Sequence, residues 1–121
     1  MTDDRKEFGA EIEKLAARYL ESEGYEILER NFRVGHKEID IIAKDSKAVV
    51  FVEVKAARQL SFGHPLFRVT KKQKLNIIMA AQKYIADNMF EGYEFRLDVI
   101  CYYPKEGGGY TLEHVVGAFT E

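Results

Sequence analysis

The sequence contains a single cysteine, Cys101, so an internal disulfide bond is excluded. It also lacks an apolar run of membrane-spanning length. Its first residues, "MTDDRKEFGAEIEK", are charged throughout and lack the apolar centre of a signal peptide. We therefore expect a cytoplasmic protein in a reducing compartment, with no membrane partner. The length of 121 residues and the hydrophobic content of 46% are typical of one globular domain over residues 1–121.

Residues 54–86 contain no Asp or Glu at all. The formal charge of this window is +7, which leaves −9 for the remainder of a chain whose net charge is −2. The basic residues of the window are Lys55, Arg58, Arg68, Lys71, Lys72, Lys74 and Lys83. Such asymmetry is typical of a basic face that attracts polyanions. A solvated helix surface, with its acidic partners elsewhere in the sequence, accounts for the charge alone equally well.

The motifs of several other enzyme classes are missing. His36, His64 and His114 do not have the spacing of zinc ligands. The glycines at 107–109 precede no predicted helix, which indicates a turn rather than a phosphate-binding loop. The sequence shows no Walker motif, dinucleotide fingerprint or Ser/His/Asp arrangement, and we expect no small-molecule cofactor.

Two helices are predicted from hydrophobic spacing. The first begins near residues 2–4 and ends at Gly24. Its expected buried stripe is Phe8, Ile12, Leu15, Ala16 and Tyr19. The second begins at Thr70, where "TKKQ" matches a capping box. The residues expected to face the core from this helix are Leu75, Ile78, Met79, Ala81 and Ile85.

Five strand segments complete the predicted order α-β-β-β-α-β-β. They are "YEILERNFRV", "EIDIIA", "AVVFVEVKA", "FRLDVICYY" and "TLEHVVGAF". The turn signal "KDSK" makes a hairpin of the second and third segments. The helix between the third and fourth strands is long enough to return the chain for parallel pairing. The sequence therefore predicts one mixed sheet with helices packed on it, in an α/β or α+β domain.

Three charged residues interrupt the two apolar strands of that hairpin: Asp40, Glu53 and Lys55. Strand alternation places Glu53 and Lys55 on one face, and Asp40 can approach Glu53 across the ladder. Two buried carboxylates repel each other, and Mg²⁺ or Mn²⁺ would relieve the repulsion. Lys55 could then neutralise charge on a phosphate and orient the attacking water. An internal salt bridge on a solvated face is the competing interpretation.

The motifs together resemble a known nuclease family. The segments are "GAEIEKLAARYLESEGYEILERNFR", "KEIDIIA", "VVFVEVKAAR", "KKQKLNIIMAAQKYI" and "FRLDVI". They resemble, over residues 9–100, the YraN-like family of predicted nucleases in the PD-(D/E)XK superfamily, which is similar to archaeal Holliday-junction resolvases. The resemblance implies a restriction-endonuclease-like fold, in which a mixed five-stranded sheet is flanked by helices.

The resemblance also implies a set of site residues. Asp40 and Glu53 match the metal-binding acids, and the Val54 carbonyl would be a further ligand. Lys55 matches the superfamily lysine, and Glu13, four residues after a glycine, is expected to reach the metal directly or through water.

The chain departs from the family pattern at three positions. Ala56 lacks the usual hydroxyl, Arg58 is displaced by one position, and Lys37 replaces a glycine.

The basic residues Arg58, Arg68, Lys71, Lys72 and Lys74 are the candidate nucleic-acid contacts. The three lysines occupy the first turn of the second helix, where cations oppose the helix dipole. Phosphate binding explains their position, and simple solubility is the alternative.

Four further residues have more ordinary explanations. Glu38 could be a metal ligand or an arginine partner, and we favour the supporting role. Arg96 and Asp98 share a strand face, as expected of a buried ion pair. Cys101 lies in an apolar run and is expected in the core.

The expected function is a Mg²⁺- or Mn²⁺-dependent DNA endonuclease that acts on branched or structured DNA, as a homodimer if both strands are cut. A nucleic-acid-binding module without catalysis on the same fold is the first alternative. A scaffold domain whose acids form surface ion pairs is the second.

Overall fold

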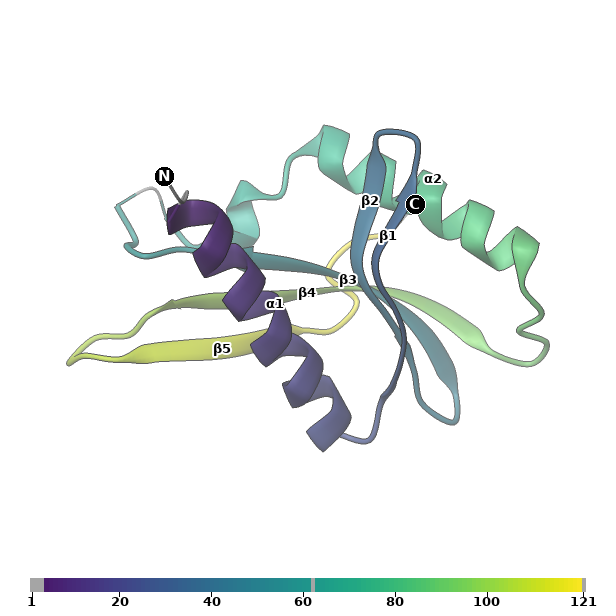
Figure 1. Ribbon diagram of the computed structural model, residues 1–121, viewed down its shortest axis with the longest axis horizontal. Coiled ribbons are helices and arrows are strands. Elements are labelled where there is room, and N and C mark those ends of the chain that lie inside the picture. The colour runs from purple at the N-terminus through teal and green to yellow at the C-terminus, as the bar shows by residue number, and fades with distance from the viewer. Residues whose placement is uncertain (1–3, 62, 121) are drawn as a thin grey trace.

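The computed structural model describes residues 4–61 and 63–120 and shows a five-stranded mixed sheet between two helices (Figure 1). The strands are β1 (Glu26–Val34), β2 (Lys37–Lys44), β3 (Ala48–Ala56), β4 (Glu94–Pro104) and β5 (Tyr110–Val115). They lie in chain order across the sheet, and only β3 and β4 are parallel. The predicted element order and mixed α/β fold class are confirmed. Within the described residues, no helix is long and apolar enough to span a membrane.

Helix α1 (Asp4–Ser22) covers one face of the sheet. Its Ile12, Ala16 and Leu20 are buried, and the last two pack on Ile41 and Val52 from the central strands. The predicted end of the helix is confirmed, because Gly24 adopts φ 92° and the chain turns there into β1.

The predicted stripe of α1 was wrong at Leu15. Its side chain remains 38% exposed, whereas Ala17 is buried. The buried side of the helix is therefore rotated from Leu15 toward Ala17.

Helix α2 (Lys71–Asp87) covers the opposite face. The predicted capping box is present. The Thr70 hydroxyl accepts a hydrogen bond from the Gln73 backbone N–H, and the Gln73 side-chain oxygen accepts one from the Thr70 backbone N–H. The predicted stripe was wrong at Leu75 and Met79, which are 56% and 44% exposed. The residues that α2 buries are Ile77, Ala80, Ala81 and Tyr84. Ala81 was predicted correctly, and Ile77 and Tyr84 directly precede the predicted Ile78 and Ile85.

Strands β2 and β3 separate partway along their length. In the described chain their pairing is confined to residues 41–44 and 49–52. Figure 1 shows the β1–β2 hairpin rising past α2, while β3 continues beside β4. The separation leaves a stretch in which the two strands are unpaired, here called the gap, and Asp40 and Val54 contact each other across it.

A short 3₁₀ helix, η1 (Pro65–Arg68), lies in the connection from β3 to α2. Its first turn is capped by the His64 side chain, whose Nδ1 accepts from the Leu66 N–H at 3.0 Å. The His64 ring also contacts the Glu113 carboxylate at 2.9 Å, which ties this connection to β5. The connection therefore holds Arg68 close to the end of β3.

The predicted ion pair of Arg96 and Asp98 is confirmed, but only its acid is fully buried, because the Arg96 side chain is 27% exposed. Asp98 is fully buried and accepts two hydrogen bonds from the Arg96 guanidinium, at 2.9 and 3.0 Å. Sequence reasoning missed a third member, His114, whose Nε2 lies 2.7 Å from Asp98 Oδ2 and whose Nδ1 lies 3.1 Å from the Tyr19 hydroxyl. Cys101 is buried in the core, as expected.

Candidate metal and phosphate site

Asp40 lies at the point where β2 leaves β3. Its Oδ2 accepts a hydrogen bond from the Val54 backbone N–H at 2.8 Å. That N–H faces the gap between the strands, so the carboxylate replaces the missing strand partner there. The carboxylate is thus fixed beside the Val54 peptide and the Glu53 side chain.

Asp40 and Glu53 form a close carboxyl pair. Burial and the hydrogen-bonding contact with Glu53 raise the pKa of Asp40 to about 9, although the Val54 N–H and the nearby Lys55 ammonium oppose the rise. A proton on Asp40 relieves the repulsion between the two groups, as a divalent cation also would. The structure therefore brings together Asp40, Glu53 and Lys55, as the sequence predicts.

Glu13 approaches the same place from α1. Burial raises the pKa of Glu13 to about 7, and the nearby carboxylates of Asp40 and Glu38 add to this effect, while Arg30 opposes it. The Asn31 amide, oriented by its hydrogen-bonding partners, donates to both Glu13 Oε1 and Glu38 Oε1 at 3.0 Å. Glu13 therefore belongs to the same electrostatic cluster as the strand acids.

Glu38 serves as an arginine partner, one of the two roles considered for it. Its Oε2 lies 3.3 Å from Arg33 Nη2. The residue also lines a cavity of about 220 Å³, here called the acidic cavity. The acidic cavity is lined by His36, Glu38, Asp40, Glu53, Gln73, Asn76 and Ile77. The N-terminal turns of α2 thus form the wall opposite the strand acids.

Asn31 is a site residue that sequence reasoning missed. It has φ 53°, a left-handed conformation that Asn tolerates better than most residues. This conformation lies in β1 opposite the segment of β2 that carries the acids. Asn is uncommon in strands, so its occurrence within a predicted strand was the feature of the sequence that could have indicated a special role for Asn31.

The donor set fits a hard divalent cation. Mg²⁺ is commonly held by one or two carboxylates and retains several waters, and Asp40, Glu53 and the Val54 carbonyl supply that kind of set. Among the described residues, no group of three or more His, Cys, Asp or Glu side chains is placed to hold a metal by itself. The fit therefore rests on two carboxylates with a carbonyl, and Glu13 lies at the edge.

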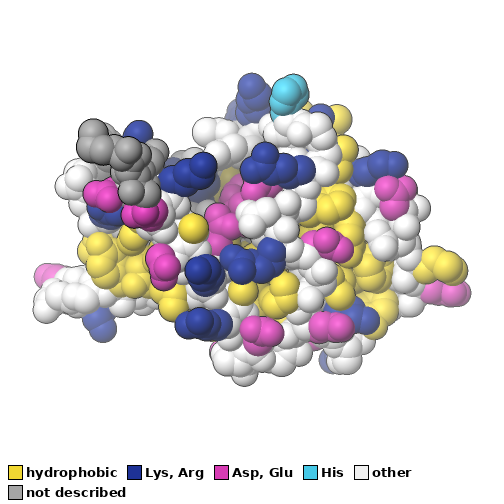
Figure 2. Space-filling model, viewed as in Figure 1, with side chains coloured by type: hydrophobic (Ala, Val, Ile, Leu, Met, Phe, Trp, Pro, Cys, Tyr) yellow, Lys and Arg dark blue, Asp and Glu magenta, His cyan; other side chains and the backbone are white. Residues whose placement is uncertain are grey.

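The predicted basic residues divide into two groups. Lys71 and Lys72 are exposed on the first turn of α2, and Lys74 lies 5.9 Å from the centre of the Phe119 ring. Arg58 and Arg68 instead line a groove of about 430 Å³ on the α1 side, here called the arginine groove. Figure 2 shows acidic side chains set back between basic ones on this face.

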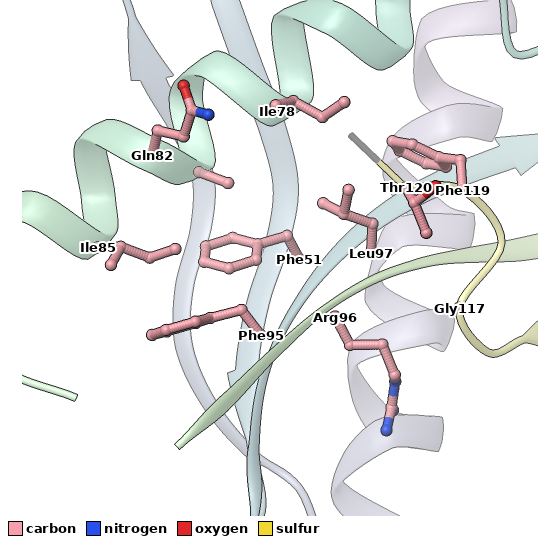
Figure 3. Close-up of a pocket in the computed structure, with 11 residues that line it drawn as sticks. Phe51, Ile78, Gln82, Ile85, Phe95, Arg96, Leu97, Gly117, Phe119 and Thr120 are labelled. Carbon is pink, nitrogen blue, oxygen red and sulfur yellow. The ribbon is translucent and has the colours of Figure 1, made fainter. Parts of the chain in front are cut away.

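An apolar cavity of about 240 Å³ lies elsewhere, between α2 and the sheet (Figure 3). Phe51, Phe95 and Phe119 point into it, whereas the Arg96 guanidinium points away toward its partner Asp98. The described residues that line this cavity include no carboxylate for a metal, so the acidic cavity is the better candidate for chemistry.

We expect Asp40→Asn to stabilise the protein in the absence of divalent cations. Because the folded-state pKa of Asp40 lies above its ordinary value of 3.8, the wild type loses stability as pH rises from about 4 to about 9. Asn keeps the acceptor for the Val54 N–H and carries no charge. At pH 8 in EDTA, the gain should be at least about 1 kcal/mol, or several degrees in Tm.

The measurement is thermal unfolding at pH 5 and pH 8, followed by circular dichroism. Asp87→Asn, at an exposed carboxylate paired with Lys83, is the matched control and should show no such gain. A wild type and an Asp40→Asn variant with parallel pH profiles would contradict the prediction.

Comparison with known proteins gives a family match. The model described as "Uncharacterised protein family UPF0102" matches residues 12–102. A UPF0102 protein of Chlorobium chlorochromatii is 44% identical over 120 residues, covering 93% of this chain and 91% of the relative. A UPF0102 protein of Caldanaerobacter subterraneus subsp. tengcongensis is 39% identical over 118 residues, covering 96% of this chain and 97% of the relative.

Comparison with solved structures gives Pyrococcus furiosus SfsA in complex with Ca²⁺. The TM-score is 0.39 and the sequence identity 19%, with 94% of this chain and 64% of that chain covered.

Proposed function

The chain belongs to the UPF0102 family, as its YraN-like motifs predict, and from the geometry of its site we propose that it is a metal-dependent DNA endonuclease. The observation that carries the proposal is the meeting of Asp40, Glu53 and Lys55 at the gap between β2 and β3. Two carboxylates and an ammonium at the end of a buried strand pair are costly for stability. A role in chemistry accounts for their placement.

The side chains would act as follows. Asp40, Glu53 and the Val54 carbonyl would hold Mg²⁺ or Mn²⁺, which when bound would activate a phosphodiester toward water. Lys55 would place its positive charge beside the phosphate and orient the water. Glu13, with its pKa near 7, is suited to exchange a proton with water near neutral pH.

The basic residues support a nucleic-acid substrate. Arg58 and Arg68 lie on the α1 side of the acids, and Lys71 and Lys72 lie on α2, whose early turns line the acidic cavity. Contacts of this kind recognise the phosphate backbone rather than base sequence. We propose that the substrate is branched or otherwise structured DNA, and that cleavage of both strands requires a homodimer.

The proposal predicts cleavage of DNA by the purified protein in Mg²⁺ or Mn²⁺ and none in EDTA. Linear, nicked, flapped and four-way DNA should be compared at equal concentration, with products resolved on denaturing gels. Cleavage of a structured substrate above linear duplex is expected. Failure on every substrate, combined with salt-dependent DNA binding, would contradict the nuclease and favour the binding module without catalysis.

A further inference from the structure

The arginine groove lies between the N-terminal half of α1 and the segment that follows β3. It is lined by Arg5, Arg58 and Arg68, together with Phe8, Glu13 and Val54. Among the described residues that line it, Glu13 alone is acidic. The groove therefore carries a net positive charge and meets the candidate metal site at Glu13 and Val54.

A cluster of aromatic rings borders this groove. The Phe8 ring centre lies 6.2 Å from those of both Tyr102 and Tyr110. The two tyrosines stack on each other at 4.9 Å, with their planes 4° apart. Tyr110 nevertheless remains 40% exposed. Figure 1 shows the β4–β5 hairpin, which carries both tyrosines, extending beyond the N-terminal end of α1.

Arg58 links the charged and aromatic parts of the surface. Its guanidinium lies 4.7 Å from the centre of the Phe8 ring, and its Nη2 donates to the Asp4 carbonyl oxygen at 3.0 Å. These contacts hold the guanidinium in place while the side chain remains exposed. An arginine fixed over an aromatic ring presents its charge without the entropy cost of ordering a free side chain.

We propose that the arginine groove and the rings of Phe8, Tyr102 and Tyr110 bind an unpaired DNA strand. The arginines would contact successive phosphates, and the aromatic surface would stack with bases. Aromatic platforms beside a basic groove are typical of single-strand binding, because every base has a face that can stack. In a continuous duplex the bases already stack on one another and cannot reach the rings.

The size of the groove favours the same conclusion. Its volume of about 430 Å³ is that of one or two nucleotides and is far smaller than a segment of duplex. A strand in the groove would pass Glu13 and Val54 and bring a phosphate toward the acids. The inference rests on the proposed function for its choice of DNA, and it makes the single-stranded segment of a branched substrate the part that is recognised.

The test is fluorescence anisotropy with labelled oligothymidine of about 20 nucleotides, compared with a duplex of equal length, in EDTA. Binding by the wild type should be at least about tenfold tighter for the single strand than for the duplex. Tyr110→Ala should weaken single-strand binding at least about fivefold, and Tyr110→Phe should not. Arg68→Ala should weaken binding and reduce the salt slope by about 0.7.

Arg18→Ala is the matched control, because it removes an exposed arginine from α1 outside the groove. Equal losses in Arg18→Ala and Arg68→Ala would overturn the proposal, as would duplex preference or normal binding by Tyr110→Ala. A second measurement, on the wild type, is photo-crosslinking to an iodouracil-substituted strand. Crosslinks at Phe8, Tyr102 or Tyr110 support the proposal, and crosslinks confined to α2 overturn it.

Binding in EDTA separates this inference from the proposed nuclease activity. Tight single-strand binding without cleavage in Mg²⁺ or Mn²⁺ would support the groove and contradict the nuclease. Cleavage that does not depend on Tyr110 or Arg68 would support the nuclease and contradict the role of the arginine groove.

Discussion

Glu53→Gln is expected to lose DNA cleavage by at least about 100-fold, while DNA binding in EDTA changes by less than about threefold. Gln preserves the size of the side chain and removes the charge that would hold a divalent cation beside Asp40. The proposed phosphate contacts lie elsewhere, on Arg58, Arg68 and the lysines of the first turn of α2. Initial cleavage rates and anisotropy titrations on the same DNA separate the two effects.

Lys55→Ala should show the same pattern with one difference. The substitution removes the positive charge that Lys55 would place beside the reacting phosphate, but it leaves the carboxylates of Asp40 and Glu53. Binding of Mn²⁺, measured by calorimetry, should therefore be retained. Glu53→Gln should lose that binding. Glu21→Gln, at an exposed position near the end of α1, is the charge-matched control and should cleave normally. Near-normal cleavage by Glu53→Gln would place the chemistry elsewhere or indicate a contaminating nuclease.

Local patterns were sufficient to predict the two α-helices, the five strands and their order, but not the short 3₁₀ helix η1. The capping box at Thr70 and the turn at Gly24 are set by residues within a few positions of each other, and the structure confirms both. The buried faces of the helices were harder to predict. On each helix two adjacent stripes satisfy the 3.6-residue period, and tertiary packing decides between them. Leu75 and Met79 are therefore exposed although their spacing suits a core.

The candidate site shows the same division between local and tertiary information. Glu53 and Lys55 are two positions apart on one strand, so their shared face follows from alternation alone. The separation of β2 from β3 is not visible in either strand. It begins next to Ile41, at the level of Asn31, which adopts a left-handed conformation within the β1–β2 hairpin.

The sequence shows that the basic residues are concentrated in residues 54–86, but it does not show how they are distributed over the surface. Its charges lie within one run of the chain, yet the chain turns between β3 and α2. Arg58 and Arg68 consequently line the arginine groove on the α1 side, whereas Lys71 and Lys72 lie on α2. The aromatic partner of the groove comes from α1 and the β4–β5 hairpin, and no sequence window contains both parts.

Asp98→Ala is expected to destabilise the protein by about 3–5 kcal/mol, the largest stability effect predicted here. The Asp98 carboxylate is fully buried and accepts from Arg96, from the Gly117 N–H at 2.9 Å and from His114. Arg96 in turn donates to the Tyr25 hydroxyl at 2.7 Å. Removing the carboxylate would leave a guanidinium without its buried counter-charge and would release the segment after β5.

The Asp98 carboxylate also makes the stability of the folded protein depend on pH in the acidic range. Burial alone would raise the pKa of Asp98, but the hydrogen bonds from His114, Arg96 and the Gly117 N–H together hold it below its usual range. A group of this kind contributes stability above its unfolded pKa of about 3.9 and loses it as pH falls through the lower folded value. Urea unfolding at pH 7 should therefore show the full loss in Asp98→Ala, and the difference from wild type should shrink below pH 4.

Asp87→Asn provides the control for this last comparison, because it removes an exposed carboxylate that is 3.0 Å from Lys83 Nζ. An exposed pair four residues apart on a helix contributes only about 0.3–0.5 kcal/mol, so this variant should unfold almost as the wild type does. A loss in Asp98→Ala of less than about 1 kcal/mol would mean that Arg96 and His114 find other partners. In that case the hydrogen bonds around Asp98 would not be the interactions that hold α1, β4 and the segment after β5 together.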